Sequence, residues 1–96
     1  MFDELKHSLT LLLKENDLSS AADSYVANGK IFSLKKDDRN NHLIIQFSLL
    51  SKPDFESLVI AVKRTIVDYG FSFKEIEKAT EPINKITLTV CENFNI

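Results

Sequence analysis

Apolar residues recur with helical spacing in one segment of the chain, SKPDFESLVIAVKRTIVDYG, residues Ser51–Gly70. Ser51 is suited to cap the helix start, because its side-chain oxygen can accept from the backbone N–H three residues later. Gly70 is suited to end the helix, because glycine readily adopts the left-handed backbone conformation found there. We therefore predict one amphipathic helix, around which the rest of the chain folds. Its buried stripe is expected to hold six apolar residues, at i, i+3, i+4, i+7, i+11 and i+14: Phe55, Leu58, Val59, Val62, Ile66 and Tyr69.

Two apolar residues of this segment, Ile60 and Val67, lie off the stripe, on the flank that carries Glu56 and Lys63. We expect another segment of the same chain to cover them. The alternative interpretation is that they form a contact ridge for a partner. Lys63 and Arg64 are expected to belong to the solvated face of the helix.

A second helix is predicted at the start of the chain, over Phe2–Glu15. Its apolar residues fall on one side, and Asp3 and Glu4 place negative charge in the first turn, where the helix dipole favours it. Leu11 falls on the opposite side, where it is either a tolerated exposed leucine or part of a second contact surface.

The segment Ser19–Ser33 is compatible with two structures. Asn28-Gly29, between SYVA and KIFS, is typical of a tight hairpin turn, because both central positions require a positive φ. This hairpin would pair Tyr25 with Phe32 and Val26 with Ile31. The helical spacing of Ala21, Ala22 and Tyr25 allows a short helix ending at Gly29 instead, but we predict the hairpin.

The remaining strands follow from alternation of apolar and polar residues. His42–Leu50 alternates throughout, and Lys85–Cys91 does the same. Phe71–Lys78 begins as a strand, but Ile76 falls on the wrong face and suggests a β-bulge or a loosened edge. The connecting turns are predicted at Lys35–Asn41 and Ala79–Asn84, and Phe94 and Ile96 are expected to tuck back onto the core.

Together these elements predict a single α+β domain over residues 1–96. The expected order is α-βββ-α-ββ. Short connections make the sheet mainly antiparallel, with four to five strands and the helices on one face.

Composition narrows the range of functions. A formal charge of −2 argues against a nucleic-acid partner, although Lys35, Lys36, Arg39, Lys63 and Arg64 leave a nucleic-acid-associated regulator as an alternative. A single cysteine cannot form an internal disulfide, and no apolar run approaches the roughly 18 residues that span a membrane. The acids near the start argue against a secretion signal. We expect a small acidic cytoplasmic protein that does not bind a membrane.

Residues that carry chemistry are few and scattered. His7, His42 and Cys91 lie in different predicted elements, so we expect no metal site and no cofactor. Gly29 belongs to the predicted turn and Gly70 to the predicted helix end. No glycine is therefore left for a phosphate-binding loop. We therefore predict that the chain is not an enzyme. A small enzyme using Cys91 or a histidine is the third alternative.

One surface is left over, namely the sheet face away from the central helix, with Ser33 and Ser48 among its residues. It is either plain solvent-exposed sheet or a place where another chain packs. We predict a protein-binding module such as an adaptor, chaperone-like protein, inhibitor or immunity-type protein, a homodimer through a sheet face or edge in its simplest form. The element order is similar to that of small acidic secretion chaperones, which implies dimerisation and binding of extended client segments, but no motif is shared. The predicted partner-binding residues are Ile44, Gln46, Ile60, Val67, Thr87 and Thr89.

Overall fold

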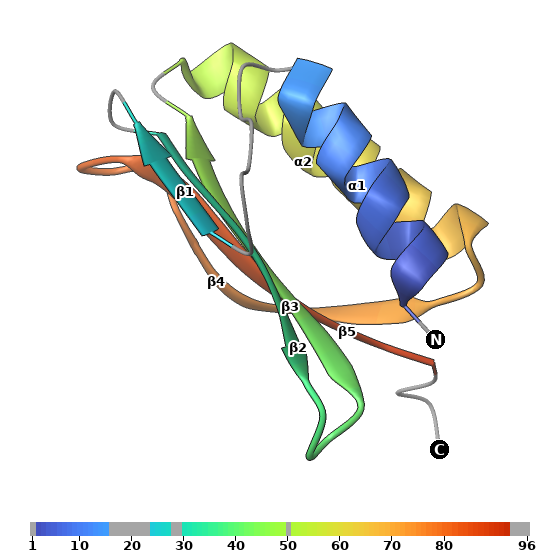
Figure 1. Cartoon of the computed structure of the whole chain (residues 1–96). Helices are drawn as coiled ribbons and strands as arrows, with labels where there is room; N and C mark the ends of the chain where they lie inside the picture. Colours follow the sequence, from blue (N-terminus) through green and yellow to red (C-terminus); the bar gives the residue numbers. More distant parts are fainter. Residues whose placement is uncertain (1, 16–23, 28–29, 50, 93–96) are drawn as a thin grey trace.

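Two helices cover one face of a five-stranded antiparallel sheet (Figure 1). The computed structural model describes residues 2–15, 24–27, 30–49 and 51–92. The elements along the chain are α1 (Asp3–Glu15), β1 (Ser24–Ala27), β2 (Lys30–Asp37), β3 (His42–Leu49), α2 (Lys52–Asp68), β4 (Ser72–Ala79) and β5 (Asn84–Cys91). The predicted class and the order α-βββ-α-ββ are therefore confirmed.

The strands are arranged in the order β1-β2-β3-β5-β4. β5 pairs antiparallel with both β3 and β4, so β3 and β4 run parallel on either side of it. A parallel relationship requires a crossover connection, and α2 provides it. This topology makes β1 and β4 the two edges of the sheet.

The predicted hairpin between β1 and β2 is confirmed in its register. Tyr25 pairs with Phe32 and Val26 with Ile31, so this segment is a strand and not the alternative short helix. The turn itself, Asn28-Gly29, lies outside the described residues, as do Phe94 and Ile96 with their expected contact to the core.

The predicted turn at Lys35–Asn41 was too long. β2 continues through Asp37, and Lys35 and Lys36 pair with β3 as ordinary strand residues. Only the tip remains a turn, and Asn41 has a φ of 55° there, which asparagine tolerates better than most residues. The charged residues misled the prediction because they lie on the exposed part of a long hairpin, where polarity is compatible with strand pairing.

α2 has the start and end that its sequence predicts. The Ser51 hydroxyl accepts from the Asp54 N–H at 3.4 Å, and Gly70 has a φ of +83°. Five of the six stripe residues are buried, but Tyr69 is 42% exposed and its assignment to the core was wrong. Tyr69 lies one residue beyond the end of α2, where the side chain no longer follows the direction of the helix face.

The core lies between the sheet and the two helices. α2 contacts β3, β4 and β5, and α1 packs beside α2. The rings of Phe47 on β3 and Phe55 on α2 meet with their centroids 5.8 Å apart. The core also includes the leucine stripe of α1 and the inward residues of β5: Leu5, Leu9, Leu13, Ile86, Leu88 and Val90.

Candidate functional site

The six predicted partner-binding residues lie on two different faces of the molecule. Ile44 and Gln46 on β3, with Thr87 and Thr89 on β5, share the sheet face that points away from the helices. Ile60 and Val67 lie on α2, which covers the opposite face. The structure therefore contains two separate candidate surfaces.

The first surface is the outer sheet face. Ile44 pairs with Thr89 and Gln46 with Thr87, and the Gln46 amide donates to the Thr87 hydroxyl at 3.3 Å. All four side chains are half-buried, and the hydrogen bond between Gln46 and Thr87 satisfies polar groups across the two strands. Such a lattice of uncharged residues is well suited to stay in contact with water. Nothing in it converges on a ligand.

The second surface lies on the flank of α2. Glu56, Ile60, Lys63 and Val67 are spaced i, i+4, i+7 and i+11, so they form one stripe along the helix. Ile60 is 63% exposed and Val67 is 59% exposed. The expectation that another segment of the chain covers them was therefore wrong.

Ion pairs join this flank to the edge strand β4. The Lys63 Nζ lies 3.1 Å from Glu75 Oε1, and the Lys78 Nζ lies 3.2 Å from Glu56 Oε2. Lys63 also lies over the ring of Phe73, with its Nζ 5.7 Å from the ring centroid. These contacts hold the flank of α2 against β4, so the two elements present one continuous surface.

A third exposed apolar residue lies on β4. The pairing of β4 with β5 shifts between Glu75 and Glu77, which leaves Ile76 as the extra residue of a β-bulge. The predicted bulge is confirmed, and Ile76 is 61% exposed. Its break in the alternation was the sequence signal for the bulge, and the Lys63–Glu75 and Lys78–Glu56 ion pairs bring this part of β4 alongside α2.

We call these three residues together the α2–β4 patch: Ile60, Val67 and Ile76. Ile60 and Val67 lie three residues before and four residues after Lys63, and Ile76 directly follows the Glu75 to which Lys63 binds. The three exposed apolar residues thus lie on two elements that an ion pair joins. Its chemistry suits contact with another protein surface and offers no nucleophile or metal ligand.

The residues of the alternative functions are not brought together. Of the five basic residues, Lys36 pairs with Asp3 at 3.8 Å and Lys63 pairs with Glu75. Cys91 is buried at the end of β5 and, by alternation with the inward-facing Val90, belongs to the outer face of the sheet. His7 lies on α1, on the other side of the sheet. Among the described residues, no three His, Cys, Asp or Glu side chains are grouped to hold a metal ion.

Comparison with protein families, with curated proteins and with solved structures finds no match to this chain. Within the described part of the chain, neither helix is long and apolar enough to cross a membrane. The geometry of the two surfaces is therefore the basis for a functional proposal.

Proposed function

We propose that this protein is a protein-binding module that associates with a second copy of itself through the α2–β4 patch. One observation carries the proposal. Three aliphatic side chains, each about three-fifths exposed, lie on α2 and β4, the two elements that the Lys63–Glu75 ion pair joins. Single exposed apolar residues are common on monomers, but grouped ones mark interaction sites.

The energetics favour a weak dimer. Full burial of one such side chain is worth roughly 1.5–3 kcal/mol. In a twofold interface both copies bury the same three side chains. The free energy gained by this burial is therefore of the same order as the cost of association, roughly 4–15 kcal/mol. We therefore expect a dimer that forms and dissociates with protein concentration.

The charges around the patch support a second copy as the partner. Lys63 and Lys78 carry positive charge, and Glu56 and Glu75 carry negative charge, so the surface is balanced. Two identical copies can then meet without net repulsion, and each cation can approach the other copy's carboxylates. A strongly acidic or strongly basic partner would gain nothing from this surface.

Contact through side chains is expected, not the addition of a strand to the sheet. The bulge at Ile76 interrupts the open edge of β4, and the charged residues around it discourage pairing with another edge. A cytoplasmic location is part of the proposal, supported by the single cysteine, which cannot form an internal disulfide.

The test is the oligomeric state of the full chain over a range of concentrations, measured by sedimentation velocity. The wild-type protein should shift from monomer to dimer between about 1 µM and 1 mM. Ile60→Lys should move this transition at least about tenfold higher in concentration, because a charge replaces a side chain that the dimer buries. A lysine at this position is also tolerated by the helix, since it follows Glu56 by four residues.

Leu11→Lys is the matched control. Leu11 is 49% exposed on α1 and lies outside the patch. This variant should dimerise like the wild type. A wild-type chain that stays monomeric up to 1 mM, or equal effects of the two substitutions, would contradict the proposal.

A further inference from the structure

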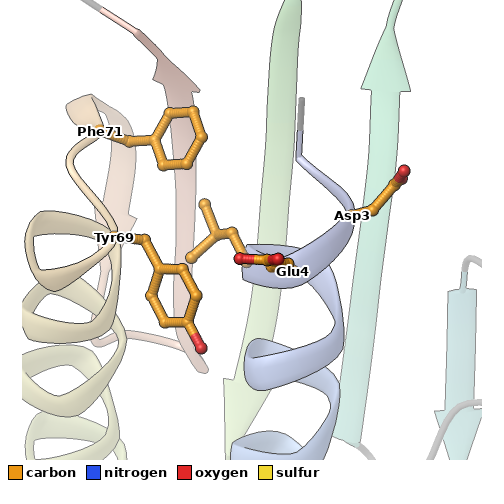
Figure 2. Close-up of a pocket in the computed structure, with 5 residues that line it drawn as sticks. Asp3, Glu4, Tyr69 and Phe71 are labelled. Carbon is orange, nitrogen blue, oxygen red and sulfur yellow. The ribbon is translucent and has the colours of Figure 1, made fainter.

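A cavity of about 350 Å³ lies between the first turn of α1 and the end of α2. Figure 2 presents its lining, which comes from two separate parts of the chain: Asp3, Glu4, Leu5, Tyr69 and Phe71. None of the three residues of the α2–β4 patch is among these lining residues, and the chemistry of the cavity is different. Its lining combines one leucine, two aromatic rings and two carboxyl side chains.

The aromatic walls are held in place by their own contacts. Phe71 packs against Phe2 with ring centroids 5.1 Å apart, and the hydroxyls of Tyr69 and Ser8 share a hydrogen bond. Leu5, which also lines the cavity, is fully buried. The walls are thus fixed before any ligand arrives, which reduces the entropy cost of binding.

The two acidic residues of the lining are oriented differently. In Figure 2 the carboxylate of Glu4 extends toward the side of the cavity where Tyr69 and Phe71 stand, whereas Asp3 points away from both rings. Asp3 instead lies 3.8 Å from Lys36, measured from Oδ1 to Nζ. Among the described residues of the lining there is no lysine or arginine, so the cavity carries negative charge, and Glu4 is the carboxylate directed toward the rings.

We propose that this cavity binds the side chain of an arginine on a protein partner. A guanidinium group can donate to the Glu4 carboxylate while its plane rests against an aromatic ring. Its aliphatic stem would contact the apolar part of the lining. An anion would be repelled by Glu4 and Asp3, and a neutral apolar group would leave Glu4 without compensation. This proposal does not depend on self-association, because it uses a different surface.

The test is an NMR titration that follows the ring resonances of Tyr69 and Phe71. The probe is N-acetyl-arginine N-methylamide, and its neutral counterpart is N-acetyl-citrulline N-methylamide. The arginine probe should shift both rings with a dissociation constant on the order of millimolar, as expected for one charged side chain at a half-open site. The citrulline probe should bind at least about fivefold more weakly, because the charge is absent.

Glu4→Gln should weaken arginine binding about fivefold, whereas Asp3→Asn should change it less than about twofold. Both substitutions remove one negative charge from the first turn of α1, and Asp3→Asn also removes the exposed ion pair with Lys36, which contributes little to stability. Equal loss in both variants, equal binding of the two probes, or no ring shift at about 50 mM probe would overturn the proposal. Ile60→Lys should bind arginine like the wild type, which separates this test from that of the dimer.

Discussion

At the scale of single residues, neighbours in the sequence occupy opposite environments. Ile66 is fully buried in the core, and Val67 beside it is more than half exposed in the α2–β4 patch. Both are β-branched aliphatic residues on the same helix. Their roles differ only because of the direction in which the helix presents them, so a substitution at one should not resemble a substitution at the other.

Ile66→Asp should unfold the protein. A carboxylate without a partner in the core costs several kcal/mol, which is comparable to the whole stability of a small domain. Val67→Asp is the control and should lower the free energy of unfolding by no more than about 0.5 kcal/mol. Circular dichroism during urea denaturation measures both, and a cooperative transition in Ile66→Asp close to that of the wild type would contradict the burial of Ile66.

Asp37 at the end of β2 has a residue-scale prediction of its own. The Asn40 amide donates to Asp37 Oδ2 at 2.8 Å and lowers the pKa of this carboxyl below its ordinary value. Asn40→Ala should therefore raise the pKa of Asp37, as measured by a carboxyl ¹³C NMR titration. An unchanged pKa would rule out the side-chain hydrogen bond as its main cause.

The sign of the pH dependence follows from the same contact. A carboxyl whose pKa is lowered in the folded state stabilises the protein above its unfolded pKa of about 3.9. That contribution disappears as the pH falls through the folded pKa of Asp37. Because the carboxyl lies on the surface of the hairpin, where water screens the interaction, only a small effect on stability is expected.

At the scale of elements, α2 is specified locally at both ends. Its N-cap, first-turn acid and glycine end are all sequence signals, and each has the predicted role in the structure. β4 is specified less well, because the bulge between Glu75 and Glu77 interrupts the alternation of inward and outward side chains along the strand. The contrast follows from where the backbone hydrogen bonds are made. The seventeen residues of α2 bond within the helix itself, whereas the edge strand β4 depends on its single neighbour β5.

Ser51→Ala should lower the free energy of unfolding by about 1 kcal/mol, because the Asp54 N–H loses its acceptor. Ser57→Ala is the control, since Ser57 is exposed within the helix and alanine favours a helix at such a position. The difference between the two variants in urea denaturation measures the cap. Equal stability of the two variants would mean that the hydrogen bond at 3.4 Å contributes nothing.

At the scale of the whole molecule, the sheet divides the predicted site into two surfaces. The outer face contains cross-strand pairs that satisfy one another, as between Gln46 and Thr87. The side with the helices contains the exposed Ile60 and Val67 of α2 and the cavity. Placement of both helices on one side of the sheet therefore decides where a partner is expected. The dimer test concerns the α2–β4 patch, and the arginine test concerns the cavity.

The sequence by itself determined the elements, their order and most of the core. The stripe of α2, the alternation of β3 and β5 and the register of the β1–β2 hairpin depend on interactions between near neighbours, so a local pattern is enough to predict them. Exposure of Ile60 and Val67, the ion pairs that join α2 to β4 and the cavity between α1 and the end of α2 depend on which elements meet across long separations. Only the tertiary structure decides these, because a repeating pattern fixes which face of an element is apolar but not which other element lies against its flank.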